Sequence, residues 1–295
     1  MDIGIFGSAT TIDGLRTQIE SAAKAGFGTF WTPQIFDMDA LTALAVISQS
    51  VPDIRLGTAV VPTYPRHPMM LAQQALTVNQ ACGGRLDLGI GLSHQPVVEG
   101  MWGIPFERPV RHMSDYLEIL MPLLTDGNVS FGGEMVTGRG AINVPAEAPP
   151  VYVAALGPQM LKLAGKKADG TLTWMTGRTT IKELTSPTIR AAAEAAGRST
   201  TVLAGVPVMV TSDPAAARER AAKDFEIYGQ LPSYRAMLDR EGYDGPEDIA
   251  VVGSIDEIGS HFEEFADAGV DQMVASVFGN QEEVAATVEG LATLL

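Results

Sequence analysis

A single cysteine, Cys82, occurs in the 295 residues, so an internal disulfide is excluded and a reducing, cytoplasmic setting is expected. No uninterrupted apolar run reaches about 18 residues, which predicts a chain without a membrane span. The first residues, MDIGIFG, lack the basic segment and the long apolar stretch of a signal peptide. Basic residues are also scarce: 20 Lys and Arg stand against 35 Asp and Glu, a formal charge of −15. This balance argues against nucleic acid or an anionic membrane as partner.

Histidine is scarce too, and the four positions are His67, His94, His112 and His261. No two of them have the i, i+4 or otherwise close spacing of a metal-binding pair. We therefore expect no metal site, which argues against a metallohydrolase. His261 stands beside two glutamates and is expected to be a solvated surface residue.

What the sequence does contain is a regular alternation of strand-length apolar runs and amphipathic helical segments. Strands are expected at residues 3–7, 28–32, 54–61, 86–91, 151–155, 170–175, 201–210 and 271–277. Helical periodicity follows these runs, as in "LRTQIESAAKAG", where Leu15, Ile19 and Ala22 share one face. Eight strand–helix units without a break in composition predict an α/β fold, a (β/α)8 TIM barrel, over residues 1–295 as one domain. A doubly wound parallel sheet is the competing architecture.

Two insertions interrupt the alternation. "VSFGGEMVTG", residues 129–138, is expected to form a small hairpin within an insertion near 127–148. A second, Gly/Pro-rich insertion spans about 230–253. Cap signals predict where the later helices begin: Asp213 with Pro214, Ser254 with Glu257, and Asn280 with Glu283.

The stretch "LDLGIGLSHQP", residues 86–96, begins as a buried strand and runs out into Ser93 and His94. Its two glycines look like the start of a dinucleotide-binding turn. That motif needs a third glycine where His94 stands and a helix that opens at once, whereas here Pro96 and a loop are expected. Active sites of (β/α)8 barrels lie at the carboxyl ends of the strands, so Ser93 and His94 are placed at the barrel mouth. The glycines before them allow a ligand or neighbouring backbone to approach closely.

Three stretches taken together resemble the luciferase-like monooxygenase superfamily of flavin and deazaflavin barrels. They are "IRLGTAVVPTYPRHPMMLAQQALTVNQACGGRLDLGIGLSH" (54–94), "PPVYVAALGPQMLKLAGKKADGTLTWMTG" (149–177) and "VVGSIDEIGSHFEEFADAGVDQMV" (251–274). The resemblance covers nearly the whole chain. Within the superfamily, "GLSH" and "VAALGP" are most similar to the branch that uses the deazaflavin coenzyme F420.

This resemblance implies a cofactor site over the barrel mouth. The bond Ala59–Val60 matches a non-proline cis peptide in a bulge of the third strand, which presses on one face of the deazaflavin ring. Gln34, after the second strand, stands where relatives place a polar contact to the ring or its side chain. Ser93 is positioned to hydrogen-bond the ring system, although it can equally be the residue that ends the strand.

The phosphate side of the cofactor is implied in the same way. Relatives bind the phosphodiester through backbone N–H groups of the turn after the fifth strand, which here comprises Ala155, Leu156, Gly157 and Pro158. Small residues at a helix N-terminus suit an anion, because free N–H groups and the positive end of the helix dipole face it. Thr176 and Gly177, after the sixth strand, occupy the second phosphate-side position.

The sequence departs from the family at two positions. Sugar-phosphate dehydrogenases of this family carry an Asp-His pair after the second strand and a glutamate after the fourth, where this chain has Gln34-Ile35 and His94. The resemblance therefore does not extend to the sugar-phosphate reaction. His94 is the candidate catalytic residue, a proton partner for hydride transfer, because imidazole titrates near neutral pH. The alternative is that it only hydrogen-bonds the cofactor.

Aromatic residues gather near the same strand ends, at Trp31, Trp102 and Trp174, with Phe36, Tyr64 and Met101 in the same loops. They form either a cover over the core or an apolar wall for a flat cofactor and a hydrophobic substrate. The function expected is an F420-dependent oxidoreductase that exchanges hydride with a small, hydrophobic organic substrate. The alternatives are an FMN-dependent monooxygenase of the same superfamily and a non-catalytic deazaflavin-binding relative. A homodimer that pairs through barrel helices is expected as the assembly.

Overall fold

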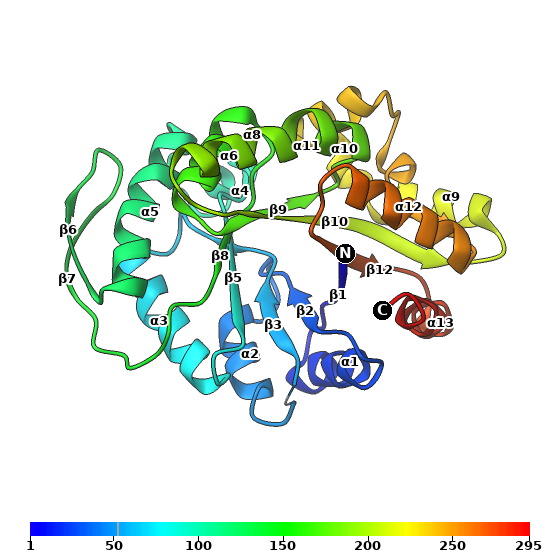
Figure 1. Cartoon of the computed structure of the whole chain (residues 1–295), viewed down its shortest axis with the longest axis horizontal. Coiled ribbons are helices and arrows are strands. Elements are labelled where there is room, and N and C mark those ends of the chain that lie inside the picture. The colour runs from blue at the N-terminus through cyan, green and yellow to red at the C-terminus, as the bar shows by residue number, and fades with distance from the viewer. Residues whose placement is uncertain (52) are drawn as a thin grey trace.

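The structure is a computed structural model that describes residues 1–51 and 53–295. Parallel strands form a closed barrel, and helices lie around its outside (Figure 1). The barrel strands are β1 (Asp2–Phe6), β2 (Thr29–Thr32), β3 (Arg55–Thr58) with β4 (Val61–Pro62), β5 (Leu86–Gly91), β8 (Val151–Val153), β9 (Gly170–Trp174), β10 (Thr201–Val210) and β12 (Gln272–Val277).

The barrel closes because β1 pairs in parallel with both β2 and β12, where Ile5 lies opposite Ala275. From β12 the pairing continues through β10, β9, β8, β5 and β3 back to β2. Each of the eight expected strands is present, with ends that differ by two residues at most. The predicted (β/α)8 barrel is confirmed, and the third strand is the one that is interrupted, at Ala59–Val60.

Helices follow the strands as the periodicity predicts: α1 (Ile12–Lys24), α2 (Ala40–Ile47), α3 (Pro68–Ala81), α5 (Pro109–Thr125), α6 (Pro158–Lys167), α8 (Ser186–Ala195), α9 (Pro214–Asp224), α12 (Ile255–Asp267) and α13 (Gln281–Ala292). A short helix α7 (Arg178–Thr180) runs through a π-helical turn, Ile181–Thr185, into α8. The three predicted caps are present. Asp213 accepts from the Ala216 N–H at 3.1 Å, and Ser254 and Asn280 form capping boxes with Glu257 and Glu283.

The first insertion is the expected hairpin, in which β6 (Asn128–Gly132) pairs antiparallel with β7 (Thr137–Ala141). The second is more ordered than its Gly/Pro content suggested. It holds α11 (Pro232–Glu241), a 3-10 turn at Pro246–Asp248, and β11 (Val251–Gly253), which extends the sheet beside β10. A further helix, α10 (Glu226–Gln230), directly precedes α11.

The expectation of a loop after Pro96 was wrong, because α4 (Gln95–Gly100) begins there. The N–H groups of Val97 and Val98 both donate to the His94 carbonyl oxygen at 2.9 Å. Proline suits the first turn of a helix, where its missing N–H has no intrahelical partner. Pro96 therefore starts a helical turn rather than a loop.

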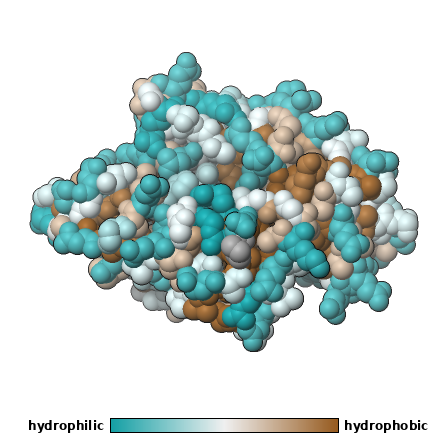
Figure 2. Space-filling view, turned by 60° about the horizontal axis from the view of Figure 1, so that its bottom comes forward, coloured by the Kyte–Doolittle hydropathy of each residue, from teal (hydrophilic) through white to brown (hydrophobic). Residues whose placement is uncertain are grey.

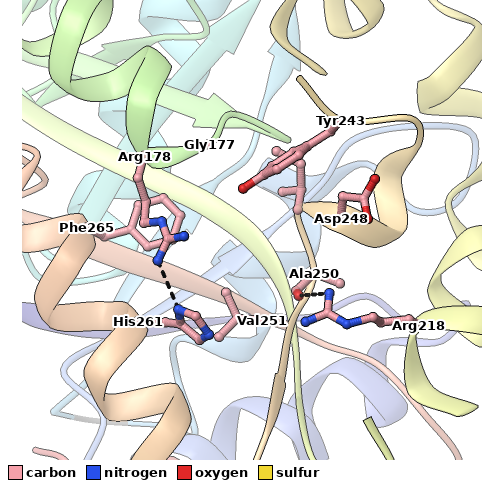
Figure 3. Close-up of a pocket in the computed structure, with 10 residues that line it drawn as sticks. Gly177, Arg178, Arg218, Tyr243, Asp248, Ala250, Val251, His261 and Phe265 are labelled. Atoms are coloured by element: carbon pink, nitrogen blue, oxygen red, sulfur yellow. Dashed lines mark hydrogen bonds between the residues drawn. The ribbon is translucent and has the colours of Figure 1, made fainter. Parts of the chain in front are cut away.

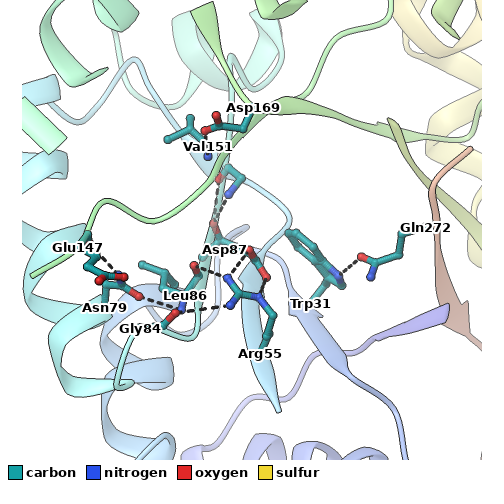
Figure 4. A network of polar contacts seen from close by, with 12 residues as sticks. Trp31, Arg55, Asn79, Gly84, Leu86, Asp87, Glu147, Val151, Asp169 and Gln272 are labelled. Carbon is teal, nitrogen blue, oxygen red and sulfur yellow. Dashed lines mark hydrogen bonds and ion pairs between the residues drawn. The ribbon is translucent and has the colours of Figure 1, made fainter. Parts of the chain in front are cut away.

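Large apolar side chains fill the barrel interior, and Trp31 is among them with 1% of its surface exposed. Trp31 packs with Leu172, Leu203 and Val274 and donates from Nε1 to Gln272 Oε1 at 3.2 Å (Figure 4). It lies within β2, so it belongs to the core and not to a wall at the mouth. This corrects the sequence-based grouping of Trp31 with the mouth aromatics.

A polar network lies at the amino ends of the strands (Figure 4). Arg55 donates to both carboxylate oxygens of Asp87, from Nε at 2.9 Å and Nη2 at 2.8 Å. Asn79 joins α3 to β5, because its side chain donates to the Glu147 carbonyl oxygen and accepts from the Leu86 N–H. In this fold the amino end supports stability and the opposite end carries function.

The surface in Figure 2 is mostly polar, with separate apolar patches between polar side chains. Among the exposed apolar residues, Val46 of α2 and Met70 of α3 have 50% and 56% of their surface accessible. Within the described residues, every helix is too short or too polar to cross a bilayer.

Candidate active site at the barrel mouth

The third strand is interrupted near the mouth, between β3 and β4. The peptide bond between Ala59 and Val60 is cis, as the resemblance implied, and both residues are half-buried against the cluster inside the barrel. A methyl group on Gly91 would lie 2.6 Å from Val60 Cγ2, and one on Gly89 would lie 2.0 Å from the Thr58 carbonyl oxygen. The two glycines of "LDLGIGLSHQP" are therefore required by the neighbouring strand. They make room for β3 and its bulge, not for a phosphate.

Ser93 and His94 follow β5 after one intervening residue, Leu92, where the barrel opens. Ser93 has φ of 63°, a left-handed conformation that is uncommon for a residue with a Cβ. His94 is half-buried, and its ring centroid lies 5.6 Å from that of Tyr234 in α11. Burial lowers the pKa of His94 below its usual value, so the imidazole is neutral at pH 7. A neutral imidazole can accept a proton from a group at the mouth.

The turn after β8 presents an open helix N-terminus. Ala155 is buried, and Gly157 is the N-cap residue of α6 with no side chain bonded to the N–H groups of the first turn. A methyl group built on Gly157 meets no atom within 4 Å, so the space in front of this helix end is clear. Leu156 is half-buried beside it, and Pro158 takes the first helical position. The first-turn N–H groups and the helix dipole make this turn suitable for an anion.

The second expected phosphate position, after β9, is different. Thr176 is fully buried and its hydroxyl donates to the Trp174 carbonyl oxygen at 3.2 Å. Gly177 faces Glu241 of α11, whose carboxylate accepts from the N–H groups of Thr179 and Thr180 at 3.2 and 2.6 Å. A carboxylate of the chain itself therefore satisfies the N–H groups beside Gly177. The contact of Thr176 and Gly177 with a phosphate stays a prediction.

Gln34 lies after β2, half-buried at the mouth side of the barrel. Its Oε1 accepts from the Ala40 N–H at 3.3 Å, next to Asp39, the N-cap residue of α2. The carbonyl end of the side chain thus caps a helix. A contact between Gln34 and a cofactor ring is not tested by these bonds and remains a prediction.

An aromatic wall covers one side of the mouth. Trp174, at the end of β9, stacks on Phe6 with centroids 5.9 Å apart and contacts Phe225 and Tyr228 edge-on at 6.0 and 5.6 Å. Tyr228 in turn lies 5.1 Å from Tyr234. Burial raises the pKa of both tyrosines, so their hydroxyl groups stay protonated at neutral pH.

Sequence reasoning placed Trp174 in this wall but missed its other members. Tyr234 lies in the Gly/Pro-rich insertion near 230–253, and Phe225 and Tyr228 lie just before it, in a segment for which no site residue was predicted. The signal that the sequence offered for this part of the wall was three aromatic residues within ten positions. Trp102, which was expected to contribute, follows α4 and stacks with none of these rings in the part of the chain that is described.

A second histidine, His112 of α5, lies behind the mouth. It is 6% exposed, stacks face to face on Tyr64 with centroids 4.0 Å apart, and its Nε2 lies 3.1 Å from Thr63 Oγ1. Burial lowers the pKa of His112 to about 4, against the opposing effect of Asp115. Tyr64 also donates to the Glu107 carbonyl oxygen, so this stack ties the end of β4 to the start of α5.

Titratable groups elsewhere have structural partners. Cys82 is buried at the end of α3, and burial raises the pKa of its thiol, as expected for a small apolar residue in the core. His261 is not simply solvated, since it is half-buried and its Nδ1 lies 3.0 Å from Arg178 Nη1. Over residues 1–51 and 53–295, no three His, Cys, Asp or Glu side chains come together in a geometry that could hold a metal ion.

The closed parallel barrel, with an open helix N-terminus and an aromatic wall at the carboxyl ends of the strands, defines a (β/α)8 barrel with a candidate ligand site at its mouth. The family model described as luciferase-like monooxygenase matches residues 3–294. The chain belongs to the luciferase-like monooxygenase family.

Two curated relatives with stated activities are each similar over about half of the chain. A putative coenzyme F420-dependent oxidoreductase from Mycobacterium tuberculosis is 34% identical over 169 residues, which is 52% of this chain and 49% of that protein. A 5,10-methylenetetrahydromethanopterin reductase from Methanolobus tindarius is 32% identical over 153 residues, 51% of this chain and 47% of that protein. The chain thus spans about half the length of these relatives.

Solved structures support the fold over the full length. The coenzyme F420-dependent tetrahydromethanopterin reductase from Methanopyrus kandleri superimposes with a TM-score of 0.85 at 23% identity. The match covers 100% of this chain and 98% of that one. At this identity the match establishes the barrel architecture and no more.

Proposed function

We propose that this chain is an F420-dependent oxidoreductase that exchanges hydride between the deazaflavin and a small, apolar organic substrate. The observation that carries the proposal is the open N-terminus of α6 at Gly157, at the mouth of a barrel whose relatives include F420-dependent proteins. The residues fit such a cofactor, because the clear space and free first-turn N–H groups suit its phosphodiester.

The polar and apolar parts of the mouth suit different parts of this cofactor. Ala155, Leu156, Gly157 and Pro158 would hold the phosphodiester. Ala59 and Val60, half-buried at the interruption of the third strand, would support one face of the ring. Ser93 and Gln34 would supply polar contacts at its edge. When bound, a deazaflavin moves two electrons at once as hydride and reacts poorly with oxygen.

The remaining chemistry belongs to the chain. His94, neutral because burial lowers its pKa, would take the proton that a substrate hydroxyl releases on oxidation, or return it in the reverse direction. The wall of Trp174, Phe225 and Tyr228 would exclude water and favour an apolar substrate. The protonated hydroxyl groups of Tyr228 and Tyr234 would be donors to a substrate oxygen.

Turnover tests the proposal. We expect F420-dependent conversion of at least one compound in a panel of apolar alcohols, ketones and activated alkenes, at equal rates with and without oxygen. Oxygen-consuming turnover that requires FMN would replace the proposal with a monooxygenase. Tight F420 binding without turnover over the whole panel would favour a non-catalytic binding protein.

A further inference from the structure

A cavity of about 160 Å³ lies outside the mouth, between the start of α7, α9, β11 and α12. It meets the predicted cofactor residues only at Gly177. Arg178, Arg218, His261 and Tyr243 direct their polar ends toward its centre, and Phe265 and Val251 form an apolar floor (Figure 3). At roughly 30 Å³ for each water molecule, the space would hold about five waters. It is large enough for a tetrahedral oxyanion.

Arg218 is the central cation of this cavity. Its Nη1 donates to the carbonyl oxygens of Glu247 and Ala250 at 3.1 and 3.4 Å, which orients the guanidinium. No carboxylate lies within ion-pair distance of Arg218 among the residues that the structure describes. Guanidinium carries five N–H donors, and a half-buried one without an anionic partner is costly. An anion in the cavity would supply the missing charge.

His261 and Tyr243 add donors without adding charge. His261 Nδ1 lies 3.0 Å from Arg178 Nη1 and 3.1 Å from Glu264 Oε2. A neutral ring that accepts from Arg178 through Nδ1 carries its proton on Nε2, and this is the tautomer that an anion in the cavity would select. Burial and the two arginines lower the pKa of His261, so the ring stays neutral at pH 7. Its Nε2–H and the Tyr243 hydroxyl are then available to oxygen atoms of a ligand, as their directions in Figure 3 show.

The acidic groups around the cavity are bonded elsewhere. Asp248 lines the cavity, but its Oδ2 accepts from the N–H groups of Asp244 and Gly245 at 3.0 and 3.5 Å. Glu264 forms an ion pair with Arg178, and Glu257 caps α12 at Ser254. Glu241 accepts from the N–H groups of α7. These partners leave Arg218 as the cation without a carboxylate.

We propose that this cavity is a binding site for a phosphate-type oxyanion, with Arg218 as its main ligand and His261 and Tyr243 as hydrogen-bond donors. A guanidinium matches two oxygens of a phosphoryl group, which favours phosphate over a spherical anion. The anion would connect α9 to α12 and to the segment before β11, and would therefore stabilise the fold. It comes either as free phosphate or as the phosphoryl group of a metabolite.

Calorimetric titration of the cofactor-free protein with inorganic phosphate, and separately with glycerol phosphate, tests the site. The buffer is chloride at matched ionic strength. We expect saturable phosphate binding that Arg218→Gln weakens at least about tenfold, the value of one charge-assisted hydrogen bond. Arg220→Gln is the matched control, because Arg220 lies on the same helix and pairs at the surface with Asp224 and Glu283. It should bind phosphate like the wild type.

Tyr243→Phe removes one donor and no packing, so it keeps the test valid if Arg218→Gln unfolds. It should weaken phosphate binding severalfold at unchanged melting temperature in chloride. If glycerol phosphate binds as tightly as inorganic phosphate, the site accepts the phosphoryl group of a metabolite. If only inorganic phosphate binds, the ligand is the free ion. Absence of saturable phosphate binding, or equal affinity in wild type, Arg218→Gln and Tyr243→Phe, would overturn the proposal.

Discussion

His112 should make the stability of this protein fall steeply between neutral and mildly acidic pH. Its ring is 6% exposed, and burial lowers the pKa from 6.5 to about 4 in the folded chain. Between these two values the unfolded chain binds a proton that the folded chain does not, so the stability contributed at neutral pH is lost as pH falls. At 1.36 kcal/mol for each pKa unit, the difference amounts to about 3 kcal/mol in full, and to about 2.5 kcal/mol between pH 7 and 4.5.

Urea unfolding at pH 7.0 and 4.5 measures this effect when wild type is compared with His112→Gln. Carboxylates also titrate in this range, so the quantity of interest is the extra loss of the wild type. Because glutamine does not titrate, we expect the free energy of unfolding of His112→Gln to fall between pH 7.0 and 4.5 by about 2 to 3 kcal/mol less than that of the wild type. His67→Gln, at an exposed histidine, is the control and should behave like the wild type. Equal losses in wild type and His112→Gln would refute the assignment of a buried, neutral His112.

Three further predictions concern the mouth and the assembly. Gly157→Val should weaken binding of intact F420 at least about tenfold, because the valine side chain fills the space before α6. It should have little effect on the binding of a phosphate-free ring fragment. Gly28→Val is the control, because Gly28 also faces open space but lies at the amino end of β2. Equal losses for both ligands would mean that the turn acts through stability. His94→Gln should lower kcat by about 10² to 10⁴. In the oxidative direction, kcat of the wild type should rise with pH as His94, whose pKa lies below 6.5, loses its proton and becomes a base, and this rise should be absent in the variant. An intact kcat and pH profile with weaker cofactor affinity would make His94 a binding residue. Light scattering at micromolar concentration should give a homodimer that Val46→Glu with Met70→Glu converts to a monomer, whereas a monomeric wild type would contradict the expected assembly.

The barrel could be predicted from the sequence because its signals are local. Apolar runs of strand length and caps such as Ser254–Glu257 depend on neighbours within a few residues, and they appear where expected. The position of His94 followed from the same reasoning, since a residue after a barrel strand must lie at the mouth.

The features that were missed depend on contacts between distant segments. Glu241 bonds the N–H groups of Thr179 and Thr180, about sixty positions away, and nothing near Glu241 in the sequence indicates this. Tyr234 lies near the ring of His94 across an even larger separation, 140 positions. Trp31 was misplaced for a related reason, because the direction of its side chain depends on Gly57 of the neighbouring strand, whose missing Cβ leaves room for the indole. The glycines of β5 likewise serve the adjacent strand, which the local motif could not show.

Cofactor preference is the central claim, and one fluorescence titration tests it directly. The same preparation is titrated with coenzyme F420 and with FMN under identical conditions. The account predicts saturable binding of F420 at least about tenfold tighter than that of FMN, a difference of about 1.4 kcal/mol. Tighter binding of FMN, or no saturable binding of F420, would contradict it.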